Sequence, residues 1–252
     1  MRALLAARVV ATLVLLTLTL SACGATATTD ARPSSSAPGR IVYAAIGASE
    51  TFGIGAGDRS RQAWPQVFTT DVLPRSAVLY NFGIPGATTA QALHDEVPAA
   101  VAVHATVVTV WLNVNDLISG VRAGDYEAQL RQVLRRLRRG GQARVLVANT
   151  PDLAQLPAYR ACLPGAPAGE RRCLIPDALL PTPQAVAVAV ADYNAAISEA
   201  AKQEGATLVD LRLDNTQLSQ HPEWISADGF HPSGQGYAVI AKQFEDAYRR
   251  IS

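Results

Sequence analysis

Short apolar runs alternate along this chain with longer segments that repeat apolar residues at helical spacing. The runs lie at Ile41–Ile46, Ala77–Asn81, Thr106–Trp111, Arg144–Ala148 and Thr207–Leu211. Runs of this length, rich in valine, leucine and isoleucine and bounded by polar or glycine residues, predict buried β-strands.

Helical patterns fill the intervals. They cover roughly Ala63–Asp71, Thr89–Ala100, Tyr126–Arg139, Pro183–Glu204 and, at the end of the chain, Ser233–Arg250. Gly140-Gly141 and Gly205 stand where the third and fourth of these helices should end. Strands that alternate with helices predict a parallel sheet covered on both faces and joined by right-handed crossovers. We therefore expect one three-layer α/β/α domain over residues 40–252.

Residues suited to acyl transfer lie near both ends of this domain. Ser49 follows the first predicted strand, within Ile46-Gly47-Ala48-Ser49-Glu50-Thr51, and Asp228-Gly229-Phe230-His231-Pro232 lies near the C-terminus. A hydroxyl attacks a carbonyl at neutral pH only when a base removes its proton, and an imidazole does this best when a carboxylate holds its tautomer. His231 and Asp228 offer that base and that carboxylate within one turn. Ser49 would stand at the carboxyl end of a strand, where open α/β sheets keep ligand sites.

Four stretches together resemble the SGNH family, also called GDSL-type esterases and lipases. Gly47-Ala48-Ser49 resembles its first block, Asn81 to Thr89 its second, Asn113-Val114-Asn115-Asp116 its third, and Asp228 to Pro232 its last. The Gly-x-Ser-x-Gly elbow of α/β-hydrolases is not matched, because Thr51 replaces its second glycine. The resemblance spans roughly Arg40 to Ser252 and implies a three-layer, flavodoxin-like fold.

The resemblance also implies a role for each site residue. Ser49 would be the nucleophile, His231 the base, and Asp228 the group that orients it. The backbone N–H groups of Ser49 and Gly86 and the side-chain amide of Asn115 would form the oxyanion hole. Donors already aimed at the developing negative oxygen are worth about 3–4 kcal/mol each. The family implies no cofactor.

Two positions depart from the family pattern. Ala48 stands where the first block normally has aspartate, and Asn113 stands where the third block normally has glycine. Asparagine tolerates a left-handed backbone better than most residues, so we expect the turn at Asn113 to survive. Neither departure removes a reacting group, but both bear on loop geometry.

Each motif also has a purely structural interpretation. Ser49 could be a turn residue, Asp228 to Pro232 a surface turn, and Asn115-Asp116 or Thr88 a helix cap. A chain that kept the fold without the chemistry would be a binding module. Ser49, Asn115, Asp228 and His231 are all present, which favours an ester hydrolase over a binding module. Acyl transfer to a sugar, in place of water, is an open alternative.

The N-terminus predicts export and anchoring. Arg2 and Arg8 precede a short apolar run from Val9 to Leu20, which has the length of a secretory signal and is too short to span a membrane. Leu20 to Cys23 resembles a bacterial lipobox, so we expect a signal peptide over residues 1–22 and a lipid on Cys23. Several acyl chains would hold the protein at the outer face of the cell membrane. A plain secreted protein is the alternative.

Residues 23–39 are rich in small and polar residues and predict a flexible tether. With Cys23 lipidated, Cys162 and Cys173 remain as a pair in an exported chain, where disulfides persist. We expect them to be bridged, with two free thiols as the alternative. The cysteines lie in the proline-rich segment from Pro151 to Pro181, which follows the fourth strand and could either wall an acyl pocket or be a surface excursion.

Charge and composition narrow the function further. The formal net charge is +1, which gives no case for nucleic-acid binding, and the arginines at 135, 136, 138 and 139 suit the end of a helix. No cluster has metal-ligand spacing. His94, beside Asp95 and Glu96, is expected on a solvated helix face. Acetylated polysaccharide, a lysophospholipid, a small lipid ester or a thioester would all suit these residues as substrate.

Overall fold

A computed structural model describes residues 40–166, 173, 180–212, 218 and 220–252. The predicted signal peptide, tether and lipidated Cys23 lie outside the described residues and stay predictions. The strands are β1 (Val42–Gly47), β2 (Val78–Asn81), β3 (Val107–Trp111), β4 (Arg144–Ala148) and β5 (Thr207–Val209). They form one sheet in the order β2-β1-β3-β4-β5, with every pairing parallel.

The helices follow the strands as the alternation predicts. The α-helices are α1 (Ser49–Phe52), α2 (Arg59–Gln62), α3 (Trp64–Val72), α4 (Thr89–His94), α5 (Glu96–Ala102), α6 (Val114–Ile118), α7 (Ala123–Arg138), α8 (Pro157–Arg160), α9 (Pro183–Glu204) and α11 (Gly234–Arg249). Short 3-10 turns lie at η1 (Arg139–Gly141), η2 (Leu153–Gln155) and η4 (Pro222–Trp224).

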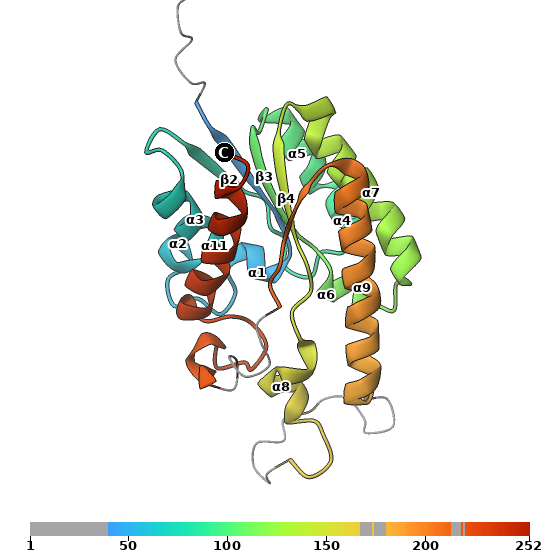
Figure 1. Ribbon diagram of the computed structural model, residues 1–252. Coiled ribbons are helices and arrows are strands. Elements are labelled where there is room, and N and C mark those ends of the chain that lie inside the picture. Colours follow the sequence, from blue (N-terminus) through green and yellow to red (C-terminus); the bar gives the residue numbers. More distant parts are fainter. Residues whose placement is uncertain (1–39, 167–172, 174–179, 213–217, 219) are drawn as a thin grey trace, which may run out of the picture. The chain divides into compact units, whose positions relative to one another are not determined.

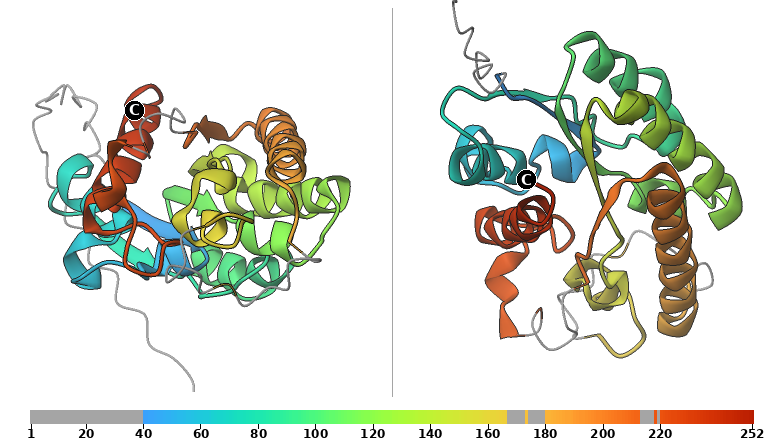
Figure 2. Two further views of the ribbon diagram at one scale, coloured as in Figure 1. Left: turned by 90° about the horizontal axis from the view of Figure 1, so that it is seen from below. Right: turned by 45° about the horizontal axis from the view of Figure 1, so that its top comes forward.

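Helices cover both faces of the sheet, which confirms the predicted three-layer architecture (Figure 1). Alternate residues of each strand point to opposite faces. Ala44 and Ile46 pack with α4, α5, α7 and α9, whereas Tyr43 and Ala45 pack with α3 and α11. Both views in Figure 2 show α3 and α11 on one side of the sheet and α7 and α9 on the other.

The long helices owe their positions to apolar stripes and caps. In α7, Tyr126, Leu130, Val133, Leu134 and Leu137 share one buried face. In α9, Thr182 caps the start, Pro183 occupies the first turn, and the left-handed Gly205 ends the helix as predicted.

One predicted helix is wrong in its extent. The pattern over Thr89–Ala100 gives two helices, α4 and α5, that meet at Asp95. Glu96 opens α5 and is buried, so the expectation of a solvated face holds for the exposed His94 and Asp95 but fails for Glu96. The reason for this burial lies at the site described below.

The carboxyl ends of the strands meet at one edge of the sheet. Gly47, at the end of β1, is level with Trp111, at the end of β3, and Asn81 ends β2 beside Ala45. The loops that leave this edge carry Ser49, Gly86 and Asn115. None of the described helices is both long and apolar enough to cross a lipid bilayer.

Candidate active site

Ser49 opens α1, directly after β1, and is almost fully buried. The approach to it is tight: a Cβ on Gly47 would lie 2.1 Å from Oγ1 of Thr51 and 2.6 Å from the carbonyl oxygen of Trp111. Any side chain at position 47 would clash with these atoms, so only glycine fits there. Within the described part of the chain, the Ser49 hydroxyl is hydrogen-bonded to Oε2 of Glu50, at 3.3 Å, and not to His231.

The predicted base, His231, is hydrogen-bonded to its predicted carboxylate partner, Asp228. Nδ1 of His231 lies 2.6 Å from Oδ2 of Asp228. The other carboxylate oxygen, Oδ1, accepts from the Ser226 hydroxyl at 2.9 Å and from the backbone N–H groups of Phe230 and His231 at 2.8 and 2.9 Å. Partial burial acts to raise the pKa of the Asp228 carboxyl, but its hydrogen bonds with His231, the backbone and Ser226 outweigh burial and lower this pKa to about 2.

Three of the four histidines pair with a carboxylate, and the three differ in how far the imidazole is buried. The side chain of His231 is 17% exposed, against 87% for His94 beside Asp95 and 42% for His221 beside Glu223. The three carboxylates are about equally exposed, so the burial of its ring is what distinguishes His231, and an ion pair is stronger where one partner is shielded from water. The pair at His231 is therefore the one suited to proton transfer.

The predicted oxyanion-hole residues come from the loops after β2 and β3. Gly86 has a φ of +83° and is exposed, and no atom of the described part of the chain lies within 4 Å of where a Cβ would stand. Nδ2 of Asn115, in α6, donates to the carbonyl oxygen of Ala87 at 2.9 Å. The same loops are joined by Asp116, which accepts from the backbone N–H and the hydroxyl of Thr89. Asp116 thus ties two loops together and does not cap its own helix.

Direct contacts bring all four sequence blocks together. Nδ2 of Asn81 donates to the carbonyl oxygen of Thr51 at 2.7 Å, which joins the second block to the first. A Cβ on Gly55 would lie 2.4 Å from the carbonyl oxygen of Pro232 and 3.1 Å from Cβ of His231, so the loop after α1 lies against the last block. The hydroxyl of Tyr237 donates to the carbonyl oxygen of Ile54 at 2.6 Å and holds this loop in place.

Glu96 supports the first block in a way that sequence analysis missed. Its Oε2 accepts from the backbone N–H of Gly47 at 2.8 Å, and burial raises the pKa of its carboxyl to about 8. A glutamate after two exposed residues gave no signal of this role, because the contact joins positions 49 residues apart.

The two departures from the family pattern are both buried. Ala48 fills its place with a methyl group, and neither polar side-chain atom of Asn113 has a hydrogen-bond partner among the described residues. Asn113 has a φ of −167°, so the left-handed backbone considered for it is not used. An extended φ is open to any residue, and asparagine causes no backbone strain here.

An apolar cavity of about 80 Å³ adjoins the two halves of the site. Its lining includes Glu50, Phe230 and Pro232, which are chain neighbours of Ser49 and His231. Pro151, Leu153 and Leu156 line it from the proline-rich segment, and Trp111, Trp224 and Ile240 line it from elsewhere.

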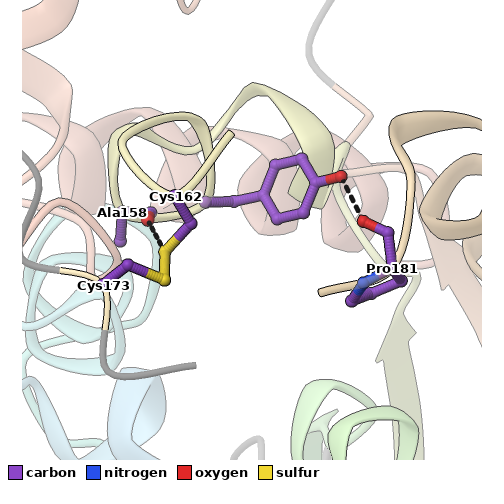
Figure 3. Close-up of a disulfide and its surroundings, with 5 residues drawn as sticks. Ala158, Cys162, Cys173 and Pro181 are labelled. Carbon is purple, nitrogen blue, oxygen red and sulfur yellow. Dashed lines mark hydrogen bonds between the residues drawn. A yellow bond between two sulfur atoms is a disulfide. The ribbon is translucent and has the colours of Figure 1, made fainter. Parts of the chain in front are cut away.

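The proline-rich segment is cross-linked within itself and also contacts the turn from Asp228 to His231. A disulfide links Cys162 and Cys173, as predicted, with Cα atoms 5.0 Å apart (Figure 3). The sulfur of Cys162 lies 3.4 Å from the carbonyl oxygen of Ala158, and the backbone N–H of Ala158 donates to the carbonyl oxygen of Gly229 at 2.9 Å. Helix α8 thus rests on the turn between Asp228 and His231. Among the described residues, no group of three or more His, Cys, Asp or Glu side chains is placed to hold a metal ion.

A parallel α/β sheet with a serine, an amide and a histidine–carboxylate pair at its carboxyl edge defines a class of hydrolytic enzymes. Residues 45–239 match the model of the GDSL-like lipase/acylhydrolase family, and the chain belongs to that family. It is an enzyme of the carboxylic-ester hydrolase type, as its sequence blocks predict.

Solved structures share this fold at low sequence identity. The lipase Lip_vut3 from a goat rumen metagenome is 17% identical with a TM-score of 0.59, over 82% of this chain and 97% of its own. The psychrotrophic esterase EstA from Pseudoalteromonas sp. is 13% identical with a TM-score of 0.57, over 83% and 97%. The acetyl xylan esterase AlAXEase is 17% identical with a TM-score of 0.57, over 84% and 100%. No curated protein sequence matches this chain.

Proposed function

We propose that this protein is a lipid-anchored, extracytoplasmic ester hydrolase that works through an acyl-serine intermediate on Ser49. The observation that carries the proposal is the His231–Asp228 pair, 2.6 Å apart, in a turn that lies against the loop following Ser49. A base held in one tautomer by a carboxylate is the group that a serine hydroxyl needs.

In the first half-reaction, Oγ of Ser49 attacks the ester carbonyl and its proton passes to Nε2 of His231. Asp228 accepts the Nδ1 hydrogen and stabilises the imidazolium. The imidazolium then protonates the departing alcohol, and the acyl group stays on Ser49. Water attacks in the second half-reaction with His231 again as base, which releases the acid and restores the serine.

The negative oxygen of each tetrahedral intermediate would lie between the N–H groups of Ser49 and Gly86 and the amide of Asn115. One hydrogen of the Asn115 amide is taken by the Ala87 carbonyl, which fixes the side chain and leaves the second hydrogen for the substrate oxygen. The Ser49 hydroxyl must turn from Glu50 toward His231, and catalytic hydrogen bonds often tighten only when substrate binds.

The apolar cavity beside Glu50 and Phe230 would take the acyl group, since these two residues are direct chain neighbours of Ser49 and His231. Its small size suits a short acyl chain. The structural relatives include an acetyl xylan esterase and a lipase, so the fold by itself leaves the alcohol part of the ester open to carbohydrate, lipid or small molecule.

A direct test compares wild type with Ser49→Ala on a short p-nitrophenyl ester. Ser49→Ala should lose about a thousandfold in activity or more, while Ser119→Ala, an exposed serine at the end of α6, should keep it. A wild-type protein that cleaves no ester would replace this proposal with the binding-module alternative. Transfer of the acyl group to a sugar in preference to water would replace it with an acyltransferase.

Membrane anchoring is tested separately. The proposal rests on Cys23 behind an apolar run of signal-peptide length. In a bacterial host, the full chain should fractionate with membranes and carry an acyl label, and Cys23→Ser should lose both. An unlabelled wild type whose membrane association is unchanged by Cys23→Ser would contradict the anchor.

A further inference from the structure

Glu50 is a carboxylic acid where an apolar residue would be expected. The letters of the G-D-S-L family name give a leucine directly after the serine, whereas this chain has Gly47-Ala48-Ser49-Glu50. The residue is 8% exposed, and its Oε2 accepts from the Ser49 hydroxyl at 3.3 Å. A buried acid in contact with the nucleophile has no part in the mechanism above.

The burial of Glu50 matters because its side chain lines the apolar cavity. Glu50 lines it together with apolar side chains that include Trp111, Val114, Leu156 and Phe230. No lysine or arginine is among the lining residues. Among the described lining residues, ionised Glu50 thus has no lysine or arginine as a counter-cation, and an alkyl chain that filled the space would take water away from its carboxylate.

The charged and titratable groups around Glu50 come from four elements. His231, in the turn before α11, interacts favourably with its negative charge. Burial raises the pKa of the Tyr237 hydroxyl in α11, and the nearby Glu50 and Asp228 raise it further. Asp152 lines the cavity after β4, and Glu96 of α5 binds Gly47. Burial raises the pKa of the Glu50 carboxyl more than His231 and Ser49 lower it.

We propose that Glu50 is a specificity-determining residue for the acyl group: its carboxylate disfavours a plain alkyl chain that fills the cavity and favours acyl groups too short to fill it. The inference rests on the proposed function in that it takes the cavity as the acyl site. Removing a charged group from water without a compensating hydrogen bond is unfavourable, whereas a protonated carboxyl tolerates an apolar neighbour far better.

The acyl preference should consequently depend on pH. We would measure kcat/KM for p-nitrophenyl hexanoate and p-nitrophenyl acetate with the purified full-length protein between about pH 5 and pH 9, above the ordinary carboxyl pKa of about 4.3. Any ionisation in the free enzyme that governs the cleavage of both esters alike cancels in their ratio. The hexanoate-to-acetate ratio should fall about tenfold as the pH rises and Glu50 ionises, which is about 1.4 kcal/mol.

Variants assign this change to one carboxyl. In Glu50→Gln the ratio should be independent of pH, because the amide does not titrate. In Glu50→Leu it should be independent of pH and about tenfold above the wild-type value at alkaline pH. Asp152→Asn, the matched change at the other acid of the cavity lining, should keep the wild-type pH dependence. A ratio that stays constant with pH in wild type, or that changes equally in Glu50→Gln, would overturn the proposal.

A binding measurement separates this inference from the proposed function. In the Ser49→Ala background, methyl hexanoate binding can be followed through the fluorescence of Trp111 and Trp224, which line the cavity. Its affinity should weaken about tenfold with rising pH, but not in Ser49→Ala with Glu50→Gln. Binding of this kind in a protein that cleaves no ester would refute the proposed function alone. Ester cleavage with binding and ratio both independent of pH would refute the role of Glu50 alone.

Discussion

The turn that carries His231 and the loop that carries Ser49 differ in how completely they are assembled. In the turn, His231 already bonds Asp228, whose second oxygen holds three further donors. In the loop, the Ser49 hydroxyl faces Glu50. The proposed base is thus held by contacts within six residues of chain, from Ser226 to His231, whereas the proposed nucleophile depends on elements far apart in sequence.

This difference suggests a division of roles. A rigid base and carboxylate need no rearrangement when the proton moves, which is the benefit of a preorganised site. A nucleophile with an alternative partner must change its hydrogen bond before it reacts. Substrate binding, by displacing the contact with Glu50, would then complete the site.

The largest effect should come from removing the base. His231→Ala should lower kcat/KM about a thousandfold or more, and adding Ser49→Ala should make it little worse, because the two side chains act as a unit. His94→Ala is the matched control, since His94 also pairs with an aspartate but lies exposed. Steady-state kinetics on an acetyl ester would decide this. If the loss in the double variant equalled the product of the losses in the two single variants, the two residues would act independently.

A smaller loss is expected at the oxyanion hole. Asn115→Ala should lower kcat about a hundredfold with KM less affected, because its amide serves an oxygen that becomes charged only in the transition state. Gln132→Ala, an exposed amide on α7, should leave both constants unchanged. A rise in KM with kcat unchanged would instead make Asn115 a substrate-binding group.

Glu96 should affect stability more than chemistry. Its folded-state pKa of about 8 lies above its ordinary value of 4.5, so the folded state favours the protonated acid. Its contribution to the free energy of unfolding is therefore complete below about pH 4.5 and is lost as the pH rises through about 8. Between these limits wild type should lose on the order of 1–3 kcal/mol relative to Glu96→Gln.

Urea unfolding at several pH values would check this difference. Glu199→Gln, on the exposed face of α9, provides a control that should keep the wild-type slope. Parallel pH profiles for wild type and Glu96→Gln would show that Glu96 does not titrate between those limits.

The smallest effect on acetyl esters should follow reduction of the disulfide. Opening the bridge between Cys162 and Cys173 removes a short covalent loop, worth about 3 kcal/mol in the chain-entropy model. Because the segment also lines the cavity, reduction should change the hexanoate-to-acetate ratio more than the rate on acetate. An equal loss on both esters, in protein shown by circular dichroism to stay folded, would mean that the bridge supports the catalytic turn instead.

Sequence patterns predicted the sheet and its helices because each strand is a compact apolar run and most helices have clear caps. The Asp228–His231 pair was also predictable, since it is local. Long-range support was not: Glu96 reaches Gly47, and Asp116 reaches Thr89, only because strands far apart in sequence end at one edge. Glu50 was visible beside Ser49, but its burial against an apolar cavity depends on residues from both ends of the domain.

The most direct test of the catalytic mechanism is to trap the acyl group. Wild-type protein mixed with p-nitrophenyl acetate and quenched with acid before steady state should gain the mass of one acetyl group, and peptide mapping should place it on Ser49. Ser49→Ala should gain no acetyl group. It should release nitrophenol no faster than the uncatalysed reaction, apart from a small residual activity due to the oxyanion hole. Turnover by Ser49→Ala at the wild-type rate, with no acetyl group on Ser49 in wild type, would contradict the mechanism.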